Sequence, residues 1–435
     1  MQPDLLIRRA TLIDGRRDMD IAIKAGRIHA ITPTHPEAEL PDGLPRIDAA
    51  GYLVSPSFVD SHFHLDSALS LGQPRLNQSG TLLEGIALWN ELKPDLTCEA
   101  IRQRALQACR QAIARGTLHI RSHVDICDDR LLAVQALLQV REEMSPWLDL
   151  QLVAFPQNGF LRDPQARANL LRALDLGVEV VGGIPHFERT QQQGAESVRE
   201  LCGIAATRGL RVDMHCDESD DPLSRHVETL AFETQRLGLQ GRVTGSHLTS
   251  MHSMDNYYVS KLLALLAEAD LQVVANPLIN LCLQGRHDTY PKRRGITRVP
   301  ELLAAGINVA YGHDCVLDPW YSLGSHDMLD VAHMGLHACQ MTSLDQLRDS
   351  YAMITDRGAA VMGLKDYGLA PGCQADLVIL QARSLLDALR LRPPRLQVLR
   401  RGKVIASTAE AVPQLQLDGS AQPFDLTWQG VEPQK

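Results

Sequence analysis

The stretch FVDSHFH (residues 58–64) is typical of a short buried strand that ends in two histidines. Residues two apart on a strand point to the same side, so His62 and His64 present two imidazoles from one rigid platform. Two such imidazoles can bind a metal ion. By itself the pair fits one exposed and one hydrogen-bonded histidine equally well, so its meaning depends on the rest of the chain.

Seven further runs of this kind follow, rich in Val, Ile and Leu without polar alternation, as expected for parallel strands buried on both faces. Polar residues mark their carboxyl ends, and from His123 onward the markers recur every 29 to 38 residues, about one strand plus one helix. Eight runs in all predict an α/β fold, a (β/α)8 TIM barrel. The seven are LHIRSHVD (118–125), LQLVAFPQ (150–157), VEVVGGIPHF (178–187), LRVDMHCDE (210–218), RVTGSHLT (242–249), LQVVANP (271–277) and INVAYGHD (307–314).

The segments between the runs have the pattern of helices. After Thr97, which suits an N-cap, apolar or small residues recur at helical spacing until Gly116. The stretch 67–96 before this helix is too long for a simple strand-to-helix turn and contains Gly72, Pro74 and Gly80. Long loops at the active face of a barrel usually cover or shape a pocket.

Both ends of the chain are typical of short strands with glycine turns, as in DIAIKAGRIHAI near the start and LQVLRRGKVIAS near the end. Neither end has enough strands to bury a core by itself. We therefore predict that residues 1–55 and 366–420 form one small β-sandwich, that residues 56–365 form the catalytic barrel, and that residues 421–435 are a poorly ordered tail.

Composition excludes several classes of protein. The net charge is -9 and no long run of Lys or Arg occurs, which disfavours a nucleic-acid binder. Nine cysteines without a Cys-x-x-Cys pair disfavour a disulfide framework or a cysteine zinc knuckle. The first residues carry acid and arginine where a signal peptide needs an apolar stretch, and no apolar run approaches the roughly 18 residues of a membrane span. We expect a cytoplasmic protein.

Further ligand-type residues lie at other predicted strand ends. His215, His247 and Asp314 end strands five, six and eight, on the one face where barrel enzymes keep their active sites. Together with His62 and His64, they predict a metal-dependent enzyme.

The sequence resembles the amidohydrolase superfamily, and within it the bacterial cytosine deaminase family, over nearly its whole length. The resemblance lies in VDSHFHLD, NQSGTLLEGI, AFPQNG, GGIPHFE, DMHCDESDD, GSHLTSMHS, ANPLINLCLQGRHDTYPKRRGITRV, GHDCVLDPWYSLG and GCQADLVIL.

The resemblance implies one metal ion held by four ligands, His62, His64, His215 and Asp314. It further implies that His247 lies beside the activated hydroxide, that Glu218 shuttles protons, and that the backbone of Leu82 contacts the substrate. Binuclear relatives carry a modified lysine at the end of strand four, but here that strand ends in GGIPHFE. One metal per chain is the consistent count, and three imidazoles with one carboxylate suit Fe(II) and Zn(II) about equally.

The residue chemistry fits hydrolytic deamination of a free cytosine-type base, cytosine to uracil or 5-methylcytosine to thymine, with release of ammonia. A metal lowers the pKa of bound water from about 15.7 towards neutrality, and the resulting hydroxide can attack an electron-poor ring carbon. Asp314 can take up the proton released by the attacking water, and Glu218 can protonate the ring nitrogen and then the leaving amine. Gln157 offers a donor and an acceptor to the ring edge, and Trp320 either walls the pocket or packs in the core.

One departure from the family pattern concerns substrate choice. Where cytosine deaminases usually have His-Asp-Asp, this chain has His313-Asp314-Cys315. A buried cysteine can simply act as a small hydrophobe. Our hypothesis is that loss of a carboxylate beside the C5 edge of the ring leaves an apolar space for a methyl group.

Two other functions stay open at this point. One is a related hydrolase that deaminates or dealkylates another amino-substituted ring, such as isoguanine or an s-triazine. The other is an inactive barrel with a structural role. We expect a small nucleobase as partner, no nucleic-acid polymer, no membrane, and assembly into a homo-oligomer.

Overall fold

The computed structural model describes residues 2–35, 43–417 and 419–428. The chain divides into two compact units, Phe58–Lys365 and the pair of segments Met1–Ser57 and Asp366–Lys435. The larger unit carries all the histidine and aspartate residues discussed above as metal ligands.

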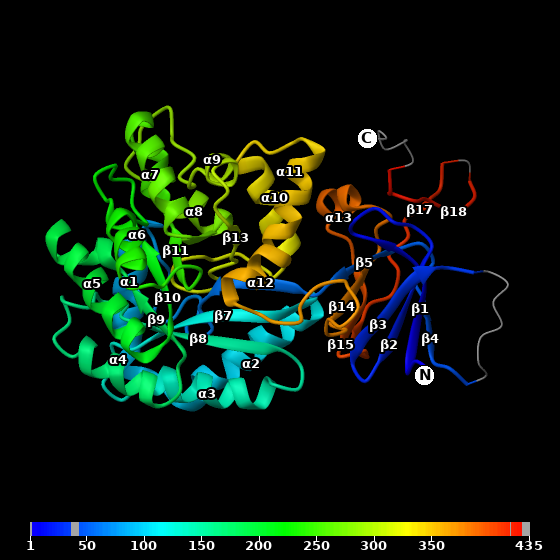
Figure 1. Cartoon of the computed structure of the whole chain (residues 1–435), viewed down its shortest axis with the longest axis horizontal. Helices are drawn as coiled ribbons and strands as arrows, with labels where there is room; N and C mark the ends of the chain where they lie inside the picture. The colour runs from blue at the N-terminus through cyan, green and yellow to red at the C-terminus, as the bar shows by residue number, and fades with distance from the viewer. Residues whose placement is uncertain (1, 36–42, 418, 429–435) are drawn as a thin grey trace. The chain divides into compact units, whose positions relative to one another are not determined.

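The larger unit is an eight-stranded parallel barrel, as predicted (Figure 1). Its strands pair in chain order, and the barrel closes through a parallel bridge between Phe63 and Asp314, where Asp314 N donates to His62 O at 2.8 Å. Each of the eight predicted runs contains one strand. These are β6 (Phe58–Phe63), β7 (Thr117–Asp125), β8 (Asp149–Phe155), β9 (Val180–Gly183), β10 (Arg211–Cys216), β11 (Val243–His247), β12 (Gln272–Ala275) and β13 (Val309–Tyr311).

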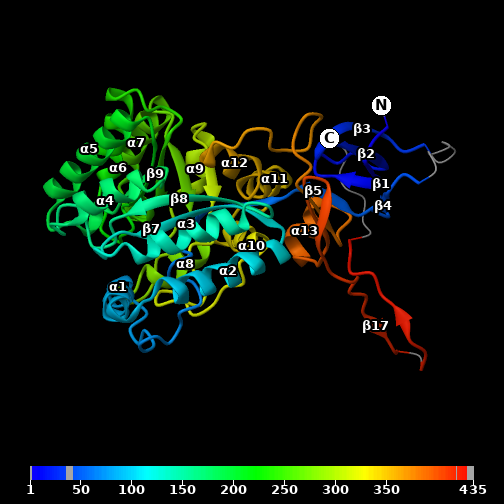
Figure 2. The ribbon, with the colours of Figure 1, turned by 90° about the horizontal axis from the view of Figure 1, so that it is seen from below.

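Helices surround the strands, and Figure 2 shows α2 and α3 side by side along the barrel. The helix predicted after Thr97 is α2, and the hydroxyl of Thr97 caps it by accepting from Ala100 N at 3.1 Å. The helices of this unit are α1 (Leu82–Leu92), α2 (Cys98–Ala114), α3 (Leu132–Met144), α4 (Ala166–Asp175), α5 (Gln191–Arg208), α6 (His226–Arg236), α7 (Asn256–Glu268), α8 (Pro277–Leu283), α9 (Val299–Ala304), α10 (Met328–Ala338), α11 (Leu344–Met353) and α12 (Asp356–Met362).

The stretch 67–96, expected as a long loop, contains helix α1. Thr81 caps this helix by accepting from Glu84 N at 3.2 Å. Its apolar side chains Ile86, Leu88 and Trp89 are buried. The helix therefore forms where one capping residue precedes an amphipathic stripe, despite the glycine-rich sequence before it.

A buried ion pair organises the barrel strands below the site. The guanidinium of Arg121 on β7 donates to Asp213 on β10 at 2.8 Å, and both side chains are fully buried. Ser246 on β11 donates to the other oxygen of Asp213 at 2.7 Å. Asp213 lies two residues before His215 on β10, and Ser246 lies directly before His247 on β11, so this network ties together the strand segments that carry both histidines.

The smaller unit is built from both chain ends, as predicted. Its eight-stranded mixed sheet has the order β16-β15-β14-β5-β1-β2-β3, with β4 paired to β1, and strand β5 joins the two ends by pairing antiparallel with β14. The strands are β1 (Leu5–Leu12), β2 (Met19–Lys24), β3 (Arg27–Pro33), β4 (Arg46–Asp48), β5 (Leu53–Pro56), β14 (Leu377–Leu380), β15 (Arg395–Arg400) and β16 (Lys403–Ser407), and helix α13 spans Leu385–Leu391.

Strand β18 (Gln422–Pro423), in the predicted tail 421–435, pairs with β17 (Gln414–Leu415). Residues 429–435 of this tail lie outside the described residues, as do residues 1, 36–42 and 418 of the predicted β-sandwich. Across the described ranges, no helix has the length and apolar character needed to cross a bilayer.

Candidate metal centre and active site

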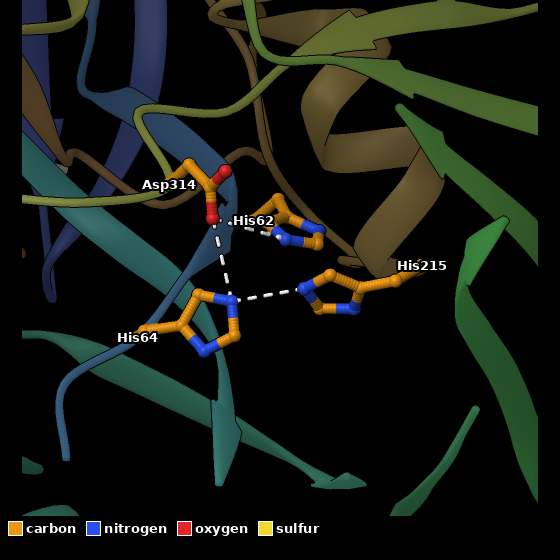
Figure 3. A group of neighbouring side chains, drawn as sticks. All are labelled: His62, His64, His215 and Asp314. Atoms are coloured by element: carbon orange, nitrogen blue, oxygen red, sulfur yellow. Dashed lines mark hydrogen bonds and ion pairs between the residues drawn. The ribbon is translucent and has the colours of Figure 1, made fainter. Parts of the chain in front are cut away.

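Four side chains from three places in the sequence converge at the mouth of the barrel (Figure 3). His62 and His64 come from the end of β6, His215 from β10, and Asp314 from the segment after β13. Their ligand atoms all lie within 4.8 Å of one another, and all four residues are buried. The sequence prediction had named these four as the metal ligands.

The geometry of the four residues fits one metal ion. Oδ1 of Asp314 lies 3.3 Å from Nε2 of both His62 and His64, and Nε2 of His64 faces Nε2 of His215 at 3.0 Å. Three imidazole nitrogens and one carboxylate oxygen that point to a common centre form a donor set suited to zinc or ferrous iron. The cluster is therefore consistent with a divalent metal.

The charge states of the cluster also suit a metal. Burial, followed by the nearby histidines, lowers the pKa of His215 well below its usual value and leaves a free lone pair. Burial alone would raise the pKa of Asp314, but His62, His64 and His247 outweigh it and hold this carboxyl well below its usual pKa. For His64 the balance differs: burial lowers its pKa, but the carboxylates of Asp314, Asp66 and Asp318 together raise it above its usual value.

A second group of possible ligands, His62, His123 and Asp213, lies below the first. Nε2 of His123 is 3.7 Å from Asp213, but the same carboxylate is already neutralised by Arg121 at 2.8 Å. A second cation would lie beside this buried guanidinium. We therefore interpret His123 as a structural residue, in line with the expectation of one metal.

The lysines nearest in sequence to the fourth barrel strand, Lys93 and Lys261, are engaged elsewhere. Nζ of Lys93 lies 2.6 Å from Oδ2 of Asp125, at the end of β7. Lys261 on α7 is exposed and pairs with Glu228 at 3.2 Å.

Glu218 and His247 lie next to the four-residue cluster. Nδ1 of His247 is 3.5 Å from Oε1 of Glu218, and its Nε2 is 3.9 Å from Oδ2 of Asp314. Burial, followed by the charge of Asp314, raises the pKa of Glu218 well above its usual value, and burial lowers that of His247 well below. A carboxyl group with a raised pKa is suited to hold and give up a proton near neutral pH.

Two residues of this site have a strained backbone. His247 (φ 72°) and Asp314 (φ 69°) both adopt the left-handed conformation, which is uncommon for residues other than glycine. Such strain persists only where the surrounding structure imposes it, and it clusters at functional sites.

A small cavity opens beside the cluster. All four residues predicted to bind substrate line it, together with His64, His215, Glu218 and Asp314: they are Gln157, Leu82, Cys315 and Trp320. The indole of Trp320 lies 6.5 Å from the ring of His64, nearly parallel to it at 28°. The geometry therefore favours Trp320 as part of the pocket wall over Trp320 as a residue of the core.

One side of the cavity is apolar. Cys315, Ile279, Leu283 and Tyr321 form a buried hydrophobic cluster, and Leu82 and Trp320 pack against it. Burial, followed by the carboxylates Asp314 and Asp318, raises the pKa of the Cys315 thiol well above its usual value. The thiol is therefore neutral and belongs to an apolar surface.

The sequence interpretation missed several residues of the site. Phe155 stacks on the ring of His215 at 4.1 Å and 17°, and the amide of Asn280 lies 3.0 Å from His247. Ile279 and Leu283 line the cavity one helical turn apart on α8. Their spacing of four residues after Pro277 is a signal that could have identified them as one face of a short helix.

Known proteins are similar to this chain in fold and in sequence. The sequence profile of the amidohydrolase family matches residues 46–406. The crystal structure of 5-methylcytosine deaminase from Klebsiella pneumoniae, liganded with 5-fluorocytosine, is 43% identical, with a TM-score of 0.91 over 93% of this chain and 98% of that chain.

Two curated relatives are each 30% identical. N-isopropylammelide isopropyl amidohydrolase of Pseudomonas sp. (strain ADP) aligns over 92% of this chain and 97% of its own length. Pterin deaminase of Rhizobium rhizogenes aligns over 90% and 89%. With its barrel, its His/Asp cluster and these matches over most of its length, the chain belongs to the amidohydrolase family.

Proposed function

We propose that this chain hydrolytically deaminates a free cytosine-type base, and that it accepts 5-methylcytosine at least as well as cytosine. The observation that carries the proposal is the 43% identity to a 5-methylcytosine deaminase over 93% of the chain. The apolar cavity wall that contains Cys315 supports the choice of substrate.

One divalent metal, Fe(II) or Zn(II), would be held by His62, His64, His215 and Asp314. When bound there, it would supply an activated water for hydrolysis. The second oxygen of Asp314 stays free to accept a proton from the attacking water, because only Oδ1 lies at 3.3 Å from the two β6 histidines.

Glu218 would carry protons between water and substrate. Its raised pKa lets it donate a proton to the ring nitrogen beside the attacked carbon; it then takes up a proton from the added water oxygen and passes it to the exocyclic amine. The new bond joins the water oxygen to the ring carbon, the bond from that carbon to the amine breaks, and ammonia leaves. His247, between Glu218 and Asp314, would stabilise the attacking oxygen.

Binding would use three parts of the cavity. The Gln157 amide offers one donor group and one acceptor to the ring edge opposite the reacting amine. The backbone of Leu82 at the start of α1 would add a contact, and the indole of Trp320 would cover the face of the ring.

Cys315 would face the C5 position of the base. A carboxylate there would have to be desolvated against a methyl group, whereas a neutral thiol within an apolar cluster can pack against it. A filled methyl-sized space contributes about 1–3 kcal/mol, which corresponds to roughly a 10–200-fold preference.

The test is ammonia release by zinc-loaded and iron-loaded protein from cytosine, 5-methylcytosine, isoguanine and amino-substituted s-triazines. We expect kcat/KM for 5-methylcytosine to equal or exceed that for cytosine, and Cys315→Asp to reverse the order. Cys282→Ser is the matched control, because Cys282 packs on the same apolar cluster without lining the cavity. A strong preference for cytosine that Cys315→Asp leaves unchanged would contradict the role of Cys315.

A second candidate is hydrolysis of an N-alkylated triazine, favoured by the relative named for N-isopropylammelide. Release of an alkylamine, with no ammonia from either cytosine, would replace the proposed function by this one. A protein that binds neither metal stoichiometrically and turns over none of these rings would be an inactive barrel.

A further inference from the structure

Asn280 lies behind the cavity wall, in helix α8, and is fully buried. Its backbone is held within the helix, since its N–H donates to Asn276 O and its carbonyl accepts from Gln284 N, both at 3.0 Å. The side-chain amide is the part of Asn280 that contacts the site.

The amide nitrogen of Asn280 faces two catalytic groups. Nδ2 lies 3.0 Å from Nδ1 of His247 and 3.5 Å from Oε1 of Glu218. An amide nitrogen carries two hydrogens and can only donate. The Asn280 amide therefore meets both groups as a donor, and its Oδ1 has no hydrogen-bond partner among the described residues.

This contact determines which nitrogen of His247 carries the proton. A neutral imidazole has one N–H, and a ring nitrogen that accepts a hydrogen bond cannot be the protonated one. Nδ1 accepts from Asn280, so the proton is on Nε2, which points towards Oδ2 of Asp314 at 3.9 Å. The opposite tautomer would bring two N–H groups together at 3.0 Å and aim a lone pair at a carboxylate.

We propose that Asn280 is a positioning residue that fixes His247 as the Nε2–H tautomer, making it a hydrogen-bond donor towards the metal cluster and keeping it from becoming a metal ligand. The ring of His247 lies 4.8 Å from that of His62 and 4.9 Å from that of His215. At that range a lone pair on Nε2 would compete for the same ion, and a proton on Nε2 removes the lone pair.

The neighbouring Asn276 does not perform this role. Its Nδ2 lies 3.2 Å from Nδ1 and 3.4 Å from Nε2 of His247, nearly equidistant, so it distinguishes poorly between the two tautomers.

The test is the ring protonation of His247 in zinc-loaded protein labelled with ¹⁵N-histidine, read from long-range ¹H–¹⁵N spectra. The His247 signals are those lost in His247→Gln. We expect a protonated Nε2 and an unprotonated Nδ1 in the wild type. Asn280→Asp, whose carboxylate accepts, should move the proton to Nδ1, and Asn280→Ser, which keeps one donor, should not.

Asn169→Asp is the matched control for the cost of a buried carboxylate, because Asn169 is also buried but its amide donates to Ile126 O and Asp129. Its His247 signals should equal those of the wild type. A wild-type His247 protonated on Nδ1 overturns the inference. This wild-type measurement decides the matter even if Asn280→Asp fails to fold, and a folded Asn280→Asp with an unchanged tautomer overturns it as well.

The kinetic consequence rests on the proposed function. We expect Asn280→Asp to lower kcat for ammonia release about 10–100-fold with a smaller change in KM, as is usual when the partner of a catalytic histidine is removed. Asn169→Asp should leave both constants unchanged. A wild type without deaminase activity on either cytosine contradicts the proposed function alone, because the tautomer is measured without turnover.

Discussion

Substituting alanine for Gly85 should disturb the active site by displacing the indole of Trp320. A Cβ at Gly85 would lie 2.3 Å from Cδ1, 2.5 Å from Nε1 and 2.8 Å from Cγ of Trp320. Ordinary carbon contacts need about 3.5–4.0 Å, so the ring must move by about 1 Å or more. Because α1 and Trp320 both contribute to the cavity wall, this movement changes the wall itself.

The expected size of the effect follows from that displacement. Overpacking of this kind costs about 1–3 kcal/mol of unfolding free energy, and a misplacement of about 1 Å near reacting groups can cost up to about 100-fold in rate. We expect Gly85→Ala to lower kcat/KM about 10–100-fold in the ammonia-release assay. The matched control is Gly203→Ala within helix α5, where an added Cβ would meet nothing within 4 Å. It should raise stability by about 1 kcal/mol and leave kcat/KM unchanged.

A double-mutant cycle identifies the cause. If the clash with Trp320 is responsible, Gly85→Ala should add little to the loss already caused by Trp320→Ala, because the indole is then absent. Fully additive losses, or a Gly85→Ala variant as active as Gly203→Ala, would refute the steric explanation.

Three further predictions concern stability. In the wild type, the buried Lys93 ammonium lies 2.6 Å from Asp125, and Asp125 also accepts from the Trp89 indole N–H at 2.8 Å. Asp125→Asn removes the charge partner of Lys93 and weakens the acceptor of Trp89, so urea titration should show that the free energy of unfolding falls by about 3 kcal/mol. Adding Lys93→Met should restore part of this stability. Burial lowers the pKa of His186 to about 4, below the unfolded value near 6.5, so the unfolded chain binds more protons between these values. His186 should therefore contribute about 3 kcal/mol to the fall in the free energy of unfolding of metal-free protein from pH 6.5 to 4, and the fall should be smaller by about this amount in His186→Gln. Removal of metal with a chelator should lower Tm and zinc should restore it, whereas His62→Ala should show little response to zinc; equal responses would contradict the proposed ligand set.

The barrel was predictable because its signal is local and repeated. Strands such as β9 (VVGG) and β13 (VAY), which are buried at every residue, leave continuous apolar runs in the sequence. Helix α1 was not predicted: its Thr81 cap and apolar stripe are local, but they were outweighed by the glycines and proline before them, and its packing depends on contacts with distant residues. The indole N–H of Trp89 donates to Asp125, and Gly85 packs against Trp320. Neither contact has a signature within the stretch 67–96.

The site was predictable at those positions where the residue type itself indicates the chemistry. Histidine and aspartate at strand ends indicate a metal site from the sequence alone, and the structure brings the four expected ligands together. Phe155 and Asn280 carry no such signal. Their roles depend on tertiary contacts between segments far apart in the sequence, which bring the ring of Phe155 onto His215 and the amide of Asn280 onto His247.

The metal cluster and the apolar wall come from different kinds of segment. The histidines of the cluster lie on strands, and Asp314 is fixed by the bridge to Phe63 that closes the barrel. The wall comes from connecting segments, with Leu82 on α1, Ile279 and Leu283 on α8, and Trp320 in the loop that follows β13. Connecting segments tolerate substitution better than a hydrogen-bonded barrel does. Substitutions in the wall can therefore change what the cavity accepts without moving the metal ligands. Cys315 connects the wall to the metal cluster, because it belongs to the wall and directly follows the ligand Asp314.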